Sequence, residues 1–113
     1  MSEEPQVFET IRKEITENDI VVFMKGNANF PQCGFSAQVV EVMKRLGIND
    51  YRDVNVLEDM DIREGIKAFS DWPTIPQLYV KGEFVGGCDI VREMYLNGEL
   101  VDLLQDNGIA VEA

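Results

Sequence analysis

The sequence predicts an α/β protein in which a small mixed sheet carries helices on both faces. Three observations lead to this class. A continuous apolar, β-branched run at residues 20–24 is typical of a strand buried on both faces. Segments with apolar residues at helical spacing stand before and after that run. Two short apolar runs near residues 78–85 flank a turn, so we expect the order helix, strand, helix, strand, helix, strand, strand, helix, helix.

The first elements are an amphipathic helix over residues 6–17 and the buried strand at 20–24. The helix is expected to direct four apolar side chains to the core: Val7, Phe8, Ile11 and Ile15. Glycine, asparagine and proline make residues 25–32 a loop that ends at Cys33. A second helix then runs to a stop at Gly47. Its core side is expected to hold Val39, Val40, Met43 and Leu46.

The middle of the chain predicts a weaker strand at 51–56 and a short helix at 59–69. One face of that helix is formed by Ile62, Ile66 and Phe69. Apolar residues 78–80 and 84–85 flank Lys81-Gly82-Glu83 and predict a hairpin.

A glycine turn at residues 86–89 leads into a helix through Leu96, with Asp89 as the expected N-cap. The pair Asn97-Gly98 is a natural helix stop. Residues 99–105 are expected to form a last helix before a frayed tail.

Length and charge limit the possible functions. The 113 residues are enough for one domain, and we expect a single domain over 1–113 with a core of about 6–105 and short frayed termini. A formal net charge of −11 argues against nucleic acid and against anionic membranes, because phosphates require clustered Lys and Arg. No apolar run approaches the ~18 residues of a membrane span.

The compartment is constrained by the start of the chain and by its cysteines. The first five residues are acidic and lack the apolar core of a signal peptide and the arginines of a transit peptide. Two cysteines are too few for a disulfide scaffold and suit a reducing compartment. We therefore expect the cytoplasm of a bacterium, with an organellar matrix after removal of a presequence as the alternative.

The stretch Cys33-Gly34-Phe35-Ser36 is half of a dithiol redox motif, with serine in place of the second cysteine. A serine hydroxyl cannot resolve a mixed disulfide. Cys33 is nevertheless expected at a helix N-terminus, where unsatisfied N–H groups stabilise a thiolate, and Lys25 closes the preceding strand. These features indicate a thiolate that serves as a ligand or as a slow nucleophile. The alternative is a buried structural cysteine.

Thr74-Ile75-Pro76 lies between the third helix and the hairpin. If the bond before Pro76 were cis, the backbone of Ile75 would be free to bind an extended peptide like an added strand. Such bonds are uncommon, about 5% of X–Pro bonds, so the base rate alone favours a trans bond.

The glycine turn before Asp89 offers free N–H groups to a carboxylate, and the Asp89 carboxylate could hold an ammonium group. The alternative is a helix cap. Arg63 could clamp a second carboxylate, although an isolated arginine is usually solvated. Together these elements suit a short, extended, thiol-bearing peptide with carboxylates at both ends and a free amine at one, which describes glutathione.

Four blocks of the sequence resemble the diagnostic blocks of one family, in the family's order and spacing. They are Met24-Lys25-Gly26, PQCGFSA at residues 31–37, WPTIPQL at 72–78 and GGCDI at 86–90. With them the chain resembles the monothiol glutaredoxins of the CGFS type over nearly its whole length. The resemblance implies a thioredoxin-like (glutaredoxin) fold with a four-stranded mixed sheet, and a cis peptide before Pro76.

The resemblance also implies cofactors and roles. It implies glutathione binding and a [2Fe-2S] cluster shared between the two protomers of a homodimer, with Cys33 as cluster ligand and redox thiol. Lys25 and Arg63 match positions that hold the glycine carboxylate of glutathione. Thr74 and Ile75 match the segment that pairs with its cysteine, and Cys88 and Asp89 match the positions that hold its γ-glutamyl end.

The residues agree with a shared cluster. A [2Fe-2S] cluster requires four soft ligands, and the chain has two cysteines and no histidine. With the cofactors that the resemblance implies, we expect a cluster carrier that delivers to apo iron-sulfur proteins, and the family implies BolA-like proteins as further partners. The alternatives are a weak glutathione-dependent oxidoreductase that acts through Cys33, and a binding module that senses iron or glutathione. A Cys33–Cys88 disulfide stays possible.

Overall fold

The computed structural model describes residues 4–112, and within them the chain forms a four-stranded mixed sheet in the order β2-β1-β3-β4. Strand β1 (Ile20–Met24) pairs in parallel with β2 (Arg52–Asn55) and antiparallel with β3 (Gln77–Val80). Strand β4 (Glu83–Gly86) closes the hairpin with β3, where the register shifts between Leu78 and Tyr79. The predicted fold class is confirmed.

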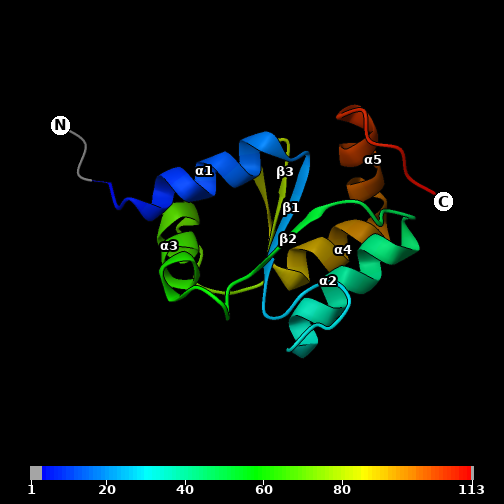
Figure 1. The fold of residues 1–113 in the computed structure, drawn as a ribbon. Helices are drawn as coiled ribbons and strands as arrows, with labels where there is room; N and C mark the ends of the chain where they lie inside the picture. Colours follow the sequence, from blue (N-terminus) through cyan, green and yellow to red (C-terminus); the bar gives the residue numbers. More distant parts are fainter. Residues whose placement is uncertain (1–3, 113) are drawn as a thin grey trace.

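Helices cover both faces of this sheet (Figure 1). Helices α1 (Val7–Glu17) and α3 (Met60–Ser70) lie on one side, and α2 (Gly34–Arg45) and α4 (Cys88–Asn97) lie on the other. Helix α5 (Glu99–Asp106) follows α4 directly and adds Leu100 and Leu104 to the core on the side of α2 and α4. All five residues of β1 are buried, because both faces of this central strand are covered.

The core is divided by the sheet into two clusters. Alternate residues of β1 point to opposite faces, so Val22 belongs to the cluster under α2 and α4, and Val21 to the cluster under α1 and α3. The first cluster is completed mainly by Val39, Met43, Leu46, Ile48, Val91 and Leu100. The second is completed mainly by Ile11, Ile15, Phe23, Ile66 and Tyr79.

Element boundaries differ from the expected ones by a residue or two, with one difference in chemistry. The N-cap of α4 is Gly87, and Asp89 lies in the first turn with no capping hydrogen bond. The prediction of Asp89 as the N-cap is therefore wrong. The glycine turn enters the helix without help from a side chain, which leaves the Asp89 carboxylate exposed at the positive end of the helix dipole.

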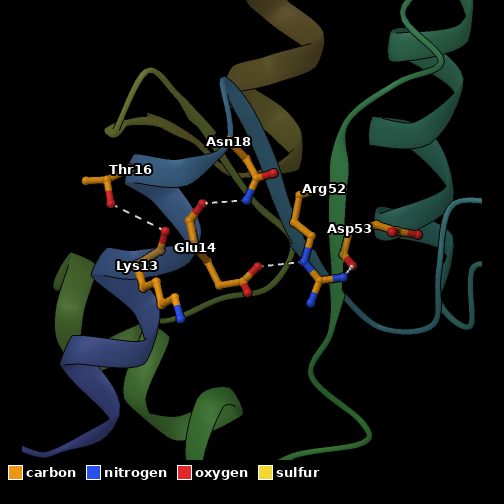
Figure 2. Close-up of polar contacts among 6 residues, drawn as sticks. All are labelled: Lys13, Glu14, Thr16, Asn18, Arg52 and Asp53. Atoms are coloured by element: carbon orange, nitrogen blue, oxygen red, sulfur yellow. Dashed lines mark hydrogen bonds and ion pairs between the residues drawn. The ribbon is translucent and has the colours of Figure 1, made fainter.

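Helix α1 contacts the sheet edge through an ion pair (Figure 2). The Arg52 Nε atom of β2 lies 2.6 Å from Glu14 Oε2. Within the end of the helix, the side chain of the C-cap residue Asn18 donates to the Glu14 carbonyl oxygen at 2.9 Å. Arg52 is about half exposed, so this ion pair orients α1 more than it stabilises the fold.

The segment after α5 folds back against the end of α2. The backbone N–H of Glu112 donates to the Leu46 carbonyl oxygen at the end of α2, over 2.7 Å. Ile109 and Val111 pack against the cluster on that face. Among residues 4–112, no helix has the length and apolar character that a membrane crossing requires.

The division of the core predicts additive mutational effects. Ile48 and Ile66 are buried in different clusters, on opposite sides of the sheet. We expect Ile48→Val and Ile66→Val each to lower the free energy of unfolding by about 0.5–1.5 kcal/mol. Because the two sites share no packing layer, the double variant should lose the sum to within ~0.5 kcal/mol in urea denaturation. A larger coupling would contradict two separate clusters.

Candidate functional site

Cys33 occupies the N-cap position of α2, just past the end of β1 and its loop. Its backbone is extended, with φ −154° and ψ 146°, and its carbonyl oxygen accepts from Ala37 N–H at 2.9 Å. The backbone N–H of Ser36 donates to the Cys33 Sγ atom at 3.5 Å. The thiol therefore takes the place of a capping side chain, where the N–H groups of the first turn favour negative charge.

The surroundings of Cys33 favour its thiolate. Partial burial acts to raise the pKa of Cys33, but hydrogen bonds from the Ser36 backbone, the Ser36 side chain and the Phe35 backbone, together with the charge of Lys25, bring the pKa below its ordinary value. Side-chain exposure at this site is intermediate, so a partner sulfur or metal can reach the thiolate.

The loop before Cys33 folds back on the end of β1. The Gln32 N–H donates to the Lys25 carbonyl oxygen at 2.8 Å, which brings Lys25 beside the residue that precedes Cys33. Gly26 has φ +87°, and a Cβ atom there would clash with the Phe30 carbonyl oxygen and lie 2.7 Å from Gln32 N. This turn therefore requires glycine.

A groove of about 170 Å³ brings together four of the predicted site residues: Thr74, Ile75, Cys88 and Asp89. Pro76 also lines it, and the peptide bond between Ile75 and Pro76 is cis, as the resemblance implied. The other lining residues are Phe35, Trp72, Gly87 and Ile90.

Gly87 and Trp72 form the tight side of this groove. A Cβ atom at Gly87 would lie 3.0 Å from Trp72 Nε1 and 3.4 Å from the Pro76 carbonyl oxygen. Trp72 Nε1 is buried and has no hydrogen-bond partner within residues 4–112. Sequence reasoning missed the contribution of Trp72, Phe35 and Ile90 to the groove. In the sequence, the one feature that pointed to this contribution was a large aromatic residue, Trp72, just before Thr74-Ile75-Pro76.

Cys88 is the opposite of Cys33 in character. Its side chain is buried, and its Sγ donates to the Gln38 side-chain oxygen of α2 over 3.3 Å. Burial raises the pKa of Cys88, as do the charges of Asp89 and Cys33, while Arg92 opposes them. Both cysteines are free thiols in the structure. Cys88 is therefore held as a protonated thiol near neutral pH.

Lys25 and Arg63 stand apart from the other cations. Of the ten basic side chains, all of which lie within residues 4–112, five form ion pairs: Arg12, Arg45, Arg52, Lys67 and Lys81. Among the remaining five, Lys25 and Arg63 are partly buried and the other three are exposed. Neither forms an ion pair with another residue of the described range 4–112, so in a chain with 21 acidic residues these two half-buried charges are available to an external anion. Neither lines the groove itself, and Arg63 lies on α3.

A larger hollow of about 560 Å³ lies elsewhere, beside the start of β1, and is lined by Glu17, Asp19, Asp50 and their neighbours. Cys33 follows the other end of β1, so this acidic hollow has no part in thiol chemistry.

Two large apolar side chains flank Cys33 in sequence and are exposed: Phe30 at 70% and Phe35 at 60%.

Comparison with known proteins gives the family. The glutaredoxin family profile matches residues 20–85. The chain is 54% identical over 96 residues to a probable monothiol glutaredoxin 2 of Rickettsia typhi, with 85% of this chain and 86% of the relative covered.

Solved structures agree with the fold. A truncated, monomeric variant of Trypanosoma brucei 1-C-Grx1 is similar with a TM-score of 0.84 and 40% identity, over 93% of this chain and 94% of that one. A buckwheat glutaredoxin–glutathione complex is similar with a TM-score of 0.77 and 26% identity, over 90% of each chain. This chain, in which Cys33 occupies the N-cap of a helix, therefore belongs to the glutaredoxin family, and its relatives include monothiol glutaredoxins.

Proposed function

We propose that this protein binds glutathione in the groove beside Cys33 and, as a dimer, carries a [2Fe-2S] cluster that it delivers to apo-proteins. The observation that carries the proposal is the pairing of a thiolate-stabilising N-cap position at Cys33 with a groove lined by Ile75 and Asp89. The thiol and the groove are connected electrostatically, because the charge of Cys33 contributes to raising the pKa of Cys88 in the groove.

The groove suits glutathione group by group. The backbone of Ile75 can pair with an extended peptide. The exposed Asp89 carboxylate complements an α-ammonium group, and the N–H groups of the glycine turn at the start of α4 complement a carboxylate. Lys25 and Arg63 are left to bind the second carboxylate. The similar buckwheat glutaredoxin has been solved in complex with glutathione, which supports this assignment.

A bound cluster needs more thiolates than one chain offers. Residues 4–112 contain no group of three or more His, Cys, Asp or Glu side chains arranged to hold a metal ion. Cys88 is buried and hydrogen-bonded to Gln38, which leaves Cys33 as the one ligand from each chain. Two chains and two glutathione thiolates would then supply the four ligands of a [2Fe-2S] cluster. Such a homodimer would also cover the exposed Phe30 and Phe35.

The same ligand set is suited to handover. A cluster held half by a dissociable tripeptide can pass to an apo iron-sulfur protein or to a mixed complex with a BolA-like protein, both of which we propose as partners. The two free thiols fit a reducing compartment, and we propose the bacterial cytoplasm.

A second function is favoured by the lowered pKa of Cys33. As a glutathione-dependent oxidoreductase, the Cys33 thiolate would attack a glutathionylated thiol. It would take up the glutathionyl sulfur and release the partner thiolate. A second glutathione thiolate would then attack the Cys33 mixed disulfide, releasing Cys33 and forming glutathione disulfide. Because Ser36 cannot resolve the mixed disulfide within the chain, the second step depends on an external glutathione, and we expect slow turnover.

The carrier proposal is tested by anaerobic cluster reconstitution with glutathione, followed by visible absorption and size-exclusion chromatography. We expect a coloured dimer that returns to a colourless monomer when glutathione is removed, because glutathione supplies half of the ligands. Cys33→Ser should abolish the colour, and Cys88→Ser should leave it largely intact. A cluster that survives complete removal of glutathione, or one that Cys88→Ser alone abolishes, would contradict the ligand set.

The two thiols should differ in the pH dependence of alkylation. Because the pKa of Cys33 is lowered, its thiolate persists as the pH falls below the ordinary thiol value of about 8.5, and its iodoacetamide reaction should reach half-maximal rate at a lower pH. The pKa of Cys88 is raised, so its reaction should require a higher pH. Peptide mapping of each thiol over a pH series measures both. The reverse order would refute the assignment.

The cation assignment predicts a charge effect on glutathione affinity. Lys25→Ala and Arg63→Ala should each raise the dissociation constant of glutathione, measured by calorimetry, by roughly three- to tenfold through loss of a charge-assisted contact to a carboxylate. Lys13→Ala is the matched control, since Lys13 is unpaired within residues 4–112 but exposed on α1. Equal effects of all three substitutions would show only general electrostatic attraction.

A further inference from the structure

Two consecutive backbone amides, just after the end of β1, donate to side chains of two different elements. The Lys25 N–H donates to the Ser36 hydroxyl of α2 at 3.1 Å. The next amide, Gly26 N–H, donates to the Asn55 side-chain oxygen of β2 at 3.0 Å. The chain thus leaves the sheet between two side-chain acceptors on two different elements.

Ser36 is placed to connect this point to the reactive thiol. Its side chain is fully buried, with 0% exposure, and within residues 4–112 its neighbours include both Lys25 and Cys33. Its hydroxyl accepts from Lys25, and its backbone N–H donates to Cys33 Sγ. Ser36 therefore contacts both the start of the helix and the first residue after the strand.

Strand β2 provides the second support. Asn55 Oδ1 accepts from Gly26 N–H and also from Leu57 N–H at 3.0 Å, which fixes its own orientation. Two residues earlier on the same face of the strand, Asp53 Oδ2 accepts from Ala28 N–H at 2.8 Å. Figure 2 shows the Asp53 carboxylate on the other side of β2 from the Arg52 side chain.

Lys25 is consequently fixed through both of its backbone polar groups. Its N–H is held by Ser36 and its carbonyl oxygen by the Gln32 amide. We propose that Ser36 and Asn55 are positioning residues that hold the Lys25 ammonium group beside the Cys33 thiol. The inference rests on the proposed function only for the use of that ammonium group, which is to bind a carboxylate of glutathione.

This role explains why a serine is suited to position 36, where a dithiol motif would have its second cysteine. A serine oxygen is a good acceptor for the buried Lys25 amide, whereas a cysteine sulfur is a weak one. The charge of Lys25 is one of the influences on the Cys33 thiolate, which is consistent with an ammonium group held nearby.

The test compares two alkylating reagents of different charge at one pH on the full chain. An ammonium group beside Cys33 attracts iodoacetate but not neutral iodoacetamide. The ratio of the two rates at Cys33, read by peptide mapping, therefore reports the position of Lys25, while changes in thiolate fraction cancel. The Lys25→Gln variant lacks the charge, and at low salt we expect its iodoacetate-to-iodoacetamide rate ratio to be about threefold lower than the wild-type ratio. At high salt the attraction is screened, so the two ratios should become nearly equal.

In Ser36→Ala and in Asn55→Ala we expect the rate ratio to fall at least halfway from the wild-type value to that of Lys25→Gln. The Lys25 amide should lose hydrogen-exchange protection in Ser36→Ala, and the Gly26 amide should lose it in Asn55→Ala. Ser36→Thr, which keeps the hydroxyl, should restore the ratio. The matched controls are Ser70→Ala and Asn97→Ala, at the ends of α3 and α4. Each removes a side-chain oxygen that also accepts a backbone N–H, in these cases from Trp72 and Glu99. Both controls should keep the wild-type ratio.

Wild-type ratios in both Ser36→Ala and Asn55→Ala would overturn the proposal, even with amide protection lost, because the anchors would then be structural only. A fall in the ratio in the controls as large as in the test variants would overturn it as well. If Ser36→Ala does not fold, Asn55→Ala carries the test. Failure of glutathione or the cluster to bind counts against the proposed function instead, since the alkylation measurement uses neither.

Discussion

The burial of β1 on both faces is the constraint on which the rest of the structure depends. All five of its residues are inside, and its backbone is paired with β2 on one side and β3 on the other. A strand in this position has no free polar group along its length, so chemistry can occur only at its ends. At its carboxyl end the sequence changes from Met24 to a lysine, a glycine turn and then Cys33. Cys33, the thiol with the lowered pKa, therefore lies just beyond the end of the buried strand.

The structure gives two residues of one type opposite characters. Cys33 receives hydrogen bonds at a helix N-terminus and lies near a cation, whereas Cys88 is buried beside a carboxylate and donates its own hydrogen bond. Solvation and local charge decide this difference, because the side chains are chemically identical. Cys88 can therefore line the groove as a protonated thiol without competing with the Cys33 thiolate for a metal ion or a disulfide.

Much of the fold could be predicted from the sequence because periodicity reports burial directly. The run at 20–24 and the spacing of Val39 and Met43 each place a core face, and Cys33 follows from its position before a helix. The cis bond at Pro76 could not be reached in this way, since base rates favour trans, and it came from the family resemblance. Asp89 was misjudged as a cap because a glycine can enter a helix without a side-chain acceptor. Trp72 and Asn55 were missed because their roles depend on residues distant in the sequence.

Helix α2 links the reactive end of the molecule to its C-terminal segment. It begins at the thiol, and its far end accepts the amide of Glu112 through the Leu46 carbonyl oxygen. Twelve helical residues at 1.5 Å each separate the two ends by about 18 Å. A fluorophore or tether joined near residue 112 would therefore lie about one length of α2 away from the Cys33 end of that helix. The segment after α5 is thus an attachment point remote from the thiol.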